Sequence, residues 1–256
     1  MPLCAKHEGL CGLVALDDSM DAFVARHRLA EMAQSRLDVQ YYIWDDDMSG
    51  RLLFLALLAA ADRGVTVRIL LDDNNTSGMD DALRQLNAHP RIEVRLFNPF
   101  SFRTLRALGY LTDFARLNRR MHNKSFTADG VVTIVGGRNI GDAYFGAGEE
   151  PLFTDLDVMA IGPVVADVSQ DFERYWRSAC VSPLHRVLDI EKEDIAGRIQ
   201  MPEEWYQDPR AARYLSTLEK TQFASQLEQG DLPLIWAKTR LVSDDPKKGQ
   251  GKAHLR

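Results

Sequence analysis

The first hundred residues alternate between stretches with the hydrophobic spacing of amphipathic helices and stretches with the spacing of strands. Ser19 has the character of a helix N-cap, and Gly64 stands where a helix ends. The predicted elements are helix 19–32, strand 37–43, helix 51–63, strand 65–71, helix 80–87 and strand 92–97. Such alternation is typical of an α/β layer whose strands pair in parallel through right-handed crossovers.

A hairpin is predicted near the middle of the chain. The apolar runs 121–127 and 131–135 flank Asp129-Gly130, a dipeptide that favours a tight turn between antiparallel strands. A further strand over 156–161 follows, and Gly162-Pro163 opens another helix. The predicted fold class is therefore α/β, with a mixed β-sheet flanked by helices.

After Pro183 the apolar stripes weaken. Residues 186–230 are polar with a helical pattern, and 232–237 is a last strand-like run before a charged, glycine-rich tail. These changes predict one lobe over residues 1–185. Residues 186–256 are expected to form a helical linker and the truncated start of a second lobe.

Composition and charge narrow the class of protein. Of 256 residues, 45% are hydrophobic and 27% are charged, which indicates a folded globular chain rather than a disordered one. The formal net charge of -6 argues against a general nucleic-acid binder, because such surfaces are usually strongly basic. The three cysteines form no CxxC pair, which favours a reducing compartment.

No apolar run has the length of a membrane-spanning helix. The longest candidate, 52–61, is too short and leads directly into Asp62-Arg63. The first residues lack the order of a signal peptide, since Asp17 and Asp18 closely follow Gly12-Leu13-Val14. We expect a soluble chain that can still rest on a membrane surface.

The segment around the predicted hairpin carries the candidate chemistry. His122 and Lys124 are two residues apart, so on a strand they would share one face. An imidazole can attack phosphorus while an ammonium group neutralises the non-bridging oxygens. Gly136-Gly137 lets the backbone approach a ligand closely, and Asn139 offers an amide donor. Asp129 lies in the turn, where a structural role suits it better than direct chemistry.

These residues resemble the HxKxxxxD signature of the phospholipase D superfamily and its trailing Gly-Gly-x-Asn. Segments 37–44, 63–73 and 155–163 are similar to the skeleton of one lobe of that family. Within it, the segments 98–102, 119–124 and 136–145 resemble the bacterial C-type cardiolipin synthases. The resemblance extends from about Leu10 to the end of the chain.

The resemblance implies phosphatidyl transfer between phospholipids through a phosphohistidine, in one phospholipase D-like lobe. His122 matches the motif histidine, Lys124 and Asn139 match the phosphate ligands, and Asp129 matches the motif aspartate. Asp155 takes the position of a carboxylate that fixes the tautomer of the histidine. The resemblance implies no metal and no cofactor.

Full-length members of this family carry two such lobes, whereas this chain contains one motif, as the single-motif members that form homodimers do. None of the other histidines, His7, His27, His89, His185 and His254, has a lysine two positions later. In-line displacement needs a nucleophile and an acid on opposite sides of phosphorus. The chain is therefore a truncated piece, a half that assembles with a separate second lobe, or a homodimer. Without the general acid, a lone lobe is expected to lose about 100- to 10,000-fold in rate.

An arginine-rich, apolar stretch precedes the motif. Interleaved aromatic, leucine and arginine residues suit the interface of an anionic bilayer, but also an ordinary segment at the rim of the site. The candidate lipid contacts are Arg103, Arg106, Arg119 and Arg120, together with Arg138, which can bind a headgroup or pair with an acid. The expected location is peripheral, at the cytoplasmic face of the inner membrane.

Three rival functions stay open. Carboxylates follow two predicted strands, at 45–47 and 72–75, where they could hold Mg²⁺ for a metal-dependent phosphohydrolase; helix capping or solvation also explains them. A homodimeric single-motif phosphodiesterase or nuclease is the second, although the negative charge weighs against it. The third is a catalytically silent half-protein that binds lipid at a membrane surface.

Overall fold

One mixed sheet organises the chain in the computed structural model, which describes residues 6–100, 119–146, 153, 155–188 and 208–250. Within these residues the sheet has nine strands in the order β8-β4-β3-β2-β5-β6-β7-β1-β9. The strands are β1 (Cys11–Leu16), β2 (Arg36–Tyr41), β3 (Thr66–Asp72), β4 (Ile92–Phe97), β5 (Ser125–Ala128), β6 (Val132–Gly136), β7 (Asp157–Ile161), β8 (Val181–Pro183) and β9 (Ile235–Ala237). The predicted fold class, a mixed sheet flanked by helices, is confirmed.

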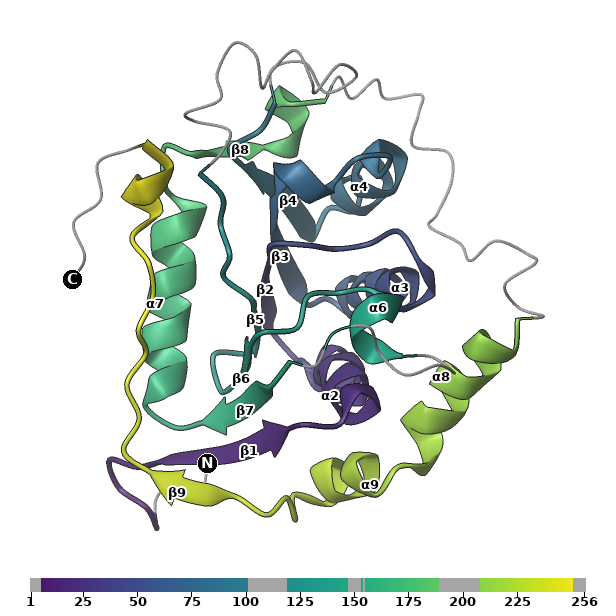
Figure 1. The fold of residues 1–256 in the computed structure, drawn as a ribbon, viewed down its shortest axis with the longest axis vertical. Coiled ribbons are helices and arrows are strands. Elements are labelled where there is room, and N and C mark those ends of the chain that lie inside the picture. The colour runs from purple at the N-terminus through teal and green to yellow at the C-terminus, as the bar shows by residue number, and fades with distance from the viewer. Residues whose placement is uncertain (1–5, 101–118, 147–152, 154, 189–207, 251–256) are drawn as a thin grey trace.

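Helices cover both faces of this sheet (Figure 1). One face carries α7 (Val164–Trp176). The other face carries α2 (Ser19–Met32), α3 (Met48–Asp62), α4 (Asp80–Asn87) and the short α6 (Asp142–Phe145), with α8 (Pro209–Lys220) and α9 (Gln222–Gln229) beyond α2. Short 3-10 turns occur at Asp73–Asn75, Leu184–Arg186 and Pro246–Gln250.

Apolar and polar side chains alternate along β2 and contact the helical layers on the two faces of the sheet. Leu37, Val39 and Tyr41 are fully buried in the main core with the larger helical layer. Asp38 points to the opposite face, where it accepts a hydrogen bond from Arg68 at 2.7 Å. Arg68 in turn contacts Glu173 of α7. The apolar face of β2 therefore fixes one layer, and its polar face fixes the other.

The sheet changes direction at β2, and this change locates the motif. β2 pairs in parallel with β3 and antiparallel with β5. Gln40 is opposite Ser125, the first residue of β5. The residues that precede Ser125 therefore lie beyond the carboxyl ends of the parallel strands.

The strand that carries the motif is shorter than predicted. β5 begins at Ser125, four residues after the expected start at residue 121. The Met121 N–H donates to the side chain of Asp72 instead of joining a strand ladder. His122 and Lys124 consequently belong to an irregular segment, and the strand alternation assumed from sequence does not apply to them.

Two other local predictions are corrected. β1 and β8 are not among the predicted strands. β8 has three residues and is too short to separate from loop by pattern alone, whereas β1 has six residues, as β2 and β4 do, and was missed. The N-cap of α2 is Asp18 rather than Ser19. Its carboxylate accepts the N–H groups of Met20 and Asp21, and so satisfies donors at the start of the helix.

Residues 208–250 pack onto the lobe instead of forming a separate unit. Tyr214 of α8 is fully buried with its ring centroid 4.6 Å from that of Phe23, and Ala211 and Leu218 join the same core. β9 pairs with β1 and so extends the same sheet. A boundary at residue 185 therefore does not describe this packing, because the weak apolar stripe of α8 still covers α2.

Candidate active site

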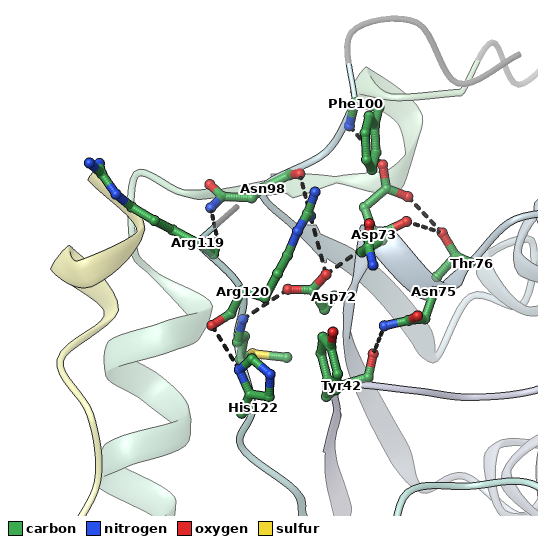
Figure 2. Close-up of polar contacts among 12 residues, drawn as sticks. Tyr42, Asp72, Asp73, Asn75, Thr76, Asn98, Phe100, Arg119, Arg120 and His122 are labelled. Atoms are coloured by element: carbon green, nitrogen blue, oxygen red, sulfur yellow. Dashed lines mark hydrogen bonds and ion pairs between the residues drawn. The ribbon is translucent and has the colours of Figure 1, made fainter. Parts of the chain in front are cut away.

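The segment from Arg119 to Lys124 runs past the carboxyl ends of β4 and β3 before it enters β5. Asn98, directly after β4, donates from its Nδ2 to the carbonyl oxygen of Arg119 at 2.7 Å. Asp72, the last residue of β3, accepts the Met121 N–H at 2.9 Å (Figure 2). Ligands of open α/β sheets usually bind at this edge, where neighbouring loops diverge.

His122 presents an exposed imidazole at this edge. Its Nδ1 lies 3.3 Å from the carbonyl oxygen of Arg120. A carbonyl oxygen can only accept, so a hydrogen bond here requires the hydrogen on Nδ1 and leaves Nε2 of the neutral ring free of one. The ring also packs against Tyr42, with centroids 4.1 Å apart. Nε2 is therefore the nitrogen available for attack or proton transfer.

Lys124 is held beside this histidine. Its Nζ donates to the carbonyl oxygen of His122 at 2.8 Å and lies 5.5 Å from the centroid of the Tyr42 ring. Burial lowers the pKa of Lys124, and the negative charges of Asp155 and Asp157 act in the opposite direction. The structure thus brings an imidazole and an amine together around Tyr42, as expected for phosphoryl chemistry.

Asn139 is joined to the residue after Tyr42, and its amide is mostly engaged. Its Oδ1 accepts the Ile43 N–H, and its Nδ2 donates to the hydroxyl of Tyr144, each at 3.0 Å. The side chain therefore holds the chain that follows β2. A primary amide has two N–H donors, so a contact from Asn139 to phosphate would use the second of them.

The two glycines before Arg138 have a different role from the one expected. A Cβ on Gly137 would overlap the Asp155 carboxylate, and one on Gly136 would overlap Asp157. These glycines admit two carboxylates against the backbone, which explains why neither position carries a side chain.

Arg138 lies in the interior and does not face a headgroup. Its side chain is 2% exposed and donates to the carbonyl oxygens of Leu16 and Asp17, each at 2.6 Å. Asp157 is fully buried, accepts the Arg138 N–H at 3.1 Å and forms an ion pair with Arg26 at 2.7 Å. The expected lipid contact of Arg138 is corrected to a structural one: the arginine connects the segment after Gly136-Gly137 to the end of β1.

Asp129 has the structural role in the turn that the sequence predicts, and its side chain also binds the backbone of residues 34–36. Asp129 and Gly130 both have positive φ, 55° and 66°, as a type I′ turn requires. The carboxylate accepts the N–H groups of Gln34, Ser35 and Arg36 and the hydroxyl of Ser35, at 2.7 to 2.9 Å. These bonds lower its pKa, although partial burial acts against them. Asp129 thus ties the hairpin to the entrance of β2.

The acidic runs after β2 and β3 mostly cap and anchor the backbone. Asp47 accepts the N–H groups of Gly50 and Asp142, and Asp73 accepts the Phe100 N–H at 2.7 Å. Burial, followed by the charge of Asp142, raises the pKa of Asp47 to about 6. Within the described ranges, no three His, Cys, Asp or Glu side chains cluster as metal ligands.

A cavity of about 410 Å³ opens beside the motif. Asn123 and Lys124 line one side of it, and Val242 and Ser243 line another. The Asn123 amide and the Ser243 hydroxyl both donate to Asp171 of α7, at 3.2 and 2.7 Å. The segment after β9, which runs alongside α7 in Figure 1, therefore forms a wall of this cavity.

Comparison with known proteins assigns the chain to a family. Residues 27–176 match the family described as "Cardiolipin synthase, PLD-like domain". The chain belongs to this family. It is 70% identical over 253 residues to "Cardiolipin synthase C" of Escherichia coli (strain K12), covering 99% of this chain and 54% of that protein. The resemblance to the cardiolipin synthases is thereby confirmed.

One further relative and one solved structure extend the comparison. An "Uncharacterized protein" of Helicobacter pylori (strain ATCC 700392 / 26695) is 38% identical, covering 92% of this chain and 47% of its own length. The crystal structure of phosphatidylserine synthase from Haemophilus influenzae Rd KW20 shares the fold, with a TM-score of 0.52 and 14% identity, covering 90% of this chain and 49% of that chain. The chain spans about half the length of the curated relatives it matches.

In this cardiolipin synthase family member, Asp155 does not occupy the position expected from sequence. The Arg120 carbonyl oxygen, rather than a carboxylate, faces Nδ1 of His122. Asp155 is half-buried beside Gly137, and its charge acts on Lys124. Its contribution within this lobe is therefore to the electrostatics around the lysine.

The arginines before the motif separate into three cases. Arg103 and Arg106 lie outside the described residues. The Arg119 side chain points away from the Asp72 network in Figure 2. Arg120 is 5% exposed, pairs with Asp72 at 3.2 Å and stacks over the Phe100 ring, so its expected membrane contact is corrected to a buried ion pair.

Tyr42 is not among the sequence candidates, and Asp72 is considered there only as a possible Mg²⁺ ligand. Tyr42 packs on His122, and Asp72 binds the segment before it. Each follows or ends a predicted parallel strand, which is the position where α/β proteins usually place functional side chains. That positional signal already draws attention to Asp72, and applied to the strand 37–43 it would have identified Tyr42 as well.

Proposed function

We propose that this chain is the motif-bearing half of an enzyme that transfers a phosphatidyl group between phospholipids to make cardiolipin. In the first step, Nε2 of His122 attacks phosphorus, the bond to the headgroup oxygen breaks, and the leaving alcohol takes up a proton. In the second step, a hydroxyl of the acceptor lipid attacks the phosphohistidine, loses its proton and displaces Nε2. The two steps together form one phosphodiester for each one broken.

The observation that carries this proposal is the arrangement of His122 and Lys124. The imidazole is exposed with Nδ1 turned to a carbonyl oxygen, which leaves Nε2 as the reactive atom. The amine of Lys124 is bonded to the same residue and can neutralise charge on a phosphoryl oxygen. The 70% identity to a protein named cardiolipin synthase C supports the choice of phospholipids as substrates.

We infer that a second lobe or a second copy of this chain completes the site. The chain has one HxK motif, and in-line displacement requires an acid on the side of phosphorus opposite to the nucleophile. The matched relatives are about twice as long, which favours a second lobe as the source of that acid. A lone copy of this lobe should accordingly have little activity.

We also propose that the enzyme works peripherally at the cytoplasmic face of the inner membrane. Among the described residues, none of the helices combines the length and apolar character needed to cross a bilayer. The proposal rests on the lipid substrates and on Arg103 and Arg106 in the sequence. Liposome co-sedimentation that ignores both anionic lipid and charge reversal of these two arginines would contradict the contact.

The decisive experiment traps the covalent intermediate. The chain is combined with the second-lobe polypeptide of a full-length relative, incubated with a phospholipid labelled in its phosphate, and quenched. We expect acid-labile label on the wild type, none on His122→Ala, and wild-type labelling on His185→Ala, an exposed histidine of the turn Leu184–Arg186. Lys124→Ala should label about 100- to 1,000-fold more slowly.

The same assay tests the rival functions. Full activity in EDTA agrees with the histidine mechanism, whereas loss of activity in EDTA would favour a metal-dependent phosphohydrolase. Cleavage of DNA in place of phospholipid would favour a nuclease. Undiminished labelling of His122→Ala would show that the nucleophile is another group.

A further inference from the structure

Asp72 is a fully buried carboxylate whose partners are concentrated on the approach to His122. Its Oδ2 accepts the Met121 N–H at 2.9 Å. Its Oδ1 accepts from Nη1 of Arg120 at 3.2 Å and from the N–H of Asn74 at 2.9 Å. Figure 2 shows the Asp72 carboxylate beside Arg120, and the His122 ring joined to the carbonyl oxygen of the same arginine.

One peptide group connects this carboxylate to the imidazole. The N–H that Asp72 accepts and the carbonyl oxygen that faces Nδ1 of His122 both belong to the peptide bond between Arg120 and Met121. That bond is trans, since the described residues contain no cis peptide. The N–H and C=O of a planar trans peptide point in opposite directions, so fixing one fixes the other. The direction in which the carbonyl points at His122 is therefore set by Asp72.

The same contacts also favour one protonation pattern of the ring. A negative charge on the N–H side polarises the peptide group and makes its carbonyl oxygen a stronger acceptor. A stronger acceptor at Nδ1 favours the tautomer with hydrogen on Nδ1 and a lone pair on Nε2. Tyr42, packed on the ring, limits the rotation that would exchange the two nitrogens.

The surroundings keep the carboxylate in place. Arg120 lies with its guanidinium 4.9 Å from the centroid of the Phe100 ring and also approaches the carbonyl oxygen of Asn98. Asn98 holds the carbonyl oxygen of Arg119, so the residues 119, 120 and 121 are each anchored to the ends of β3 or β4. A buried charge with a charged partner and backbone donors is costly to move.

We propose that Asp72 is a positioning residue, which acts through the Arg120–Met121 peptide group to hold His122 with Nδ1 protonated and Nε2 free. Asp72 itself touches neither substrate nor reacting atoms. This inference rests on the proposed function only for its consequence on rate, because the tautomer of His122 is a property of the chain itself.

The test compares two buried carboxylates. Asp72→Asn removes the charge and places an N–H₂ group or a neutral oxygen against the Met121 N–H. Asp38→Asn is the matched control, because Asp38 is equally buried and pairs with Arg68 on the neighbouring strand, with no bond to residues 119–124. The tautomer is measured by long-range ¹H–¹⁵N correlation of the His122 ring at a pH where the imidazole is neutral.

We expect the Nδ1–H tautomer to predominate in the wild type and in Asp38→Asn, and to lose its predominance in Asp72→Asn. Wild-type protein with mainly the Nε2–H tautomer would overturn the proposal without any variant, even if Asp72→Asn fails to fold. An unchanged tautomer in folded Asp72→Asn, or an equal shift in Asp38→Asn, would also overturn it.

A rate measurement separates this proposal from the proposed function. With the second lobe supplied, Asp72→Asn should lower kcat by about 10- to 100-fold with KM nearly unchanged, as expected for a misplaced nucleophile. Asp38→Asn should keep wild-type kcat per folded molecule. If the wild type transfers no phosphatidyl group, the proposed function fails, while the tautomer measurement still decides the role of Asp72.

Discussion

The ring of Tyr42 lies on the imidazole of His122 with centroids 4.1 Å apart and an angle of 31° between the ring planes. The amine of Lys124 approaches the same tyrosine ring at 5.5 Å. Tyr42 follows β2 directly, so the strand at which the sheet changes from parallel to antiparallel pairing supplies the surface against which both motif side chains are placed. The contact joins the motif side chains to the end of a strand whose apolar face is fully buried in the core.

Removal of this ring should slow the reaction without unfolding the lobe. An aromatic contact of this kind contributes about 0.5 to 1.5 kcal/mol, so Tyr42→Ala should lower kcat by about 2- to 10-fold. Tyr42→Phe retains the ring and should stay within about twofold of wild type. Initial rates of phosphatidyl transfer, with thermal unfolding as the check on folding, measure both variants. Equal loss in the two variants would show that the hydroxyl matters instead of the ring.

Asp129 should prove important for stability and dispensable for chemistry. Asp129→Ala removes the acceptor for four donors and places alanine at a φ of 55°, so unfolding should become easier by about 2 to 4 kcal/mol. Asp129→Asn keeps one acceptor oxygen and tolerates this backbone conformation, and should cost about 1 kcal/mol. Denaturant unfolding measures both values. A large loss of kcat per folded molecule in Asp129→Asn would assign the residue a direct catalytic role.

The charged side chains buried behind Gly136-Gly137 should contribute unequally to the free energy of unfolding. Asp157 lies 2.7 Å from Arg26 and 3.7 Å from Arg138, so Asp157→Asn leaves two buried guanidinium groups without their shared charge. We expect a loss of about 3 to 5 kcal/mol in the free energy of unfolding. Arg26→Met leaves Asp157 paired with Arg138 and should cost less. Chemical denaturation of both variants provides the comparison, and the reverse order would contradict this account.

Stability should increase as the pH is lowered from 7 towards 5. Burial raises the pKa values of Asp47 and Asp72 from 3.8 to about 6. Between those values the folded chain binds more protons than the unfolded chain, so the free energy of unfolding falls as the pH rises through this interval. Hydrogen bonding to His27 lowers the pKa of Glu31 to about 2, so its contribution is lost only below about pH 4.5.

Thermal unfolding between pH 4.5 and 7.5 tests this dependence. The Tm should be higher near pH 5 than near pH 7, and Asp47→Asn should give a shallower slope because one of the two titrating groups is gone. Asp46→Asn is a suitable control, since Asp46 is exposed and pairs with Arg51 at the surface. A slope unchanged in Asp47→Asn would show that other groups cause it.

The layer architecture was predictable because its strands and helices carry strong periodic patterns. The strands 66–72 and 92–97 and the Asp129-Gly130 turn lie where their patterns predict them. The motif residues were also identified by type and spacing, since an HxK pair with a trailing glycine and asparagine pattern is rare. Local signals were sufficient for both.

The remaining differences come from contacts between residues distant in sequence. Met121 leaves the predicted strand because Asp72, 49 residues earlier, accepts its N–H. Arg120 and Arg138 are basic and lie near the motif, yet each is buried against a carboxylate that sequence alone does not pair with it. The sequence of helix α8 is mostly polar, but the ring of its residue Tyr214 packs against Phe23 in the core. The order of apolar and polar residues along the chain does not identify these partners, because they meet only in the folded structure.

The position of β1 affects the order in which the lobe can be completed on the ribosome. β1 is the first strand of the described chain, and its sheet partners are β7 and β9, which follow about 140 and 220 residues later. At the usual rate of synthesis this apolar strand waits on the order of ten seconds or longer for its first neighbour. Until β7 is synthesised, the apolar residues of β1 have no partner strand within the described sheet, and unpaired strands of this kind are prone to aggregation.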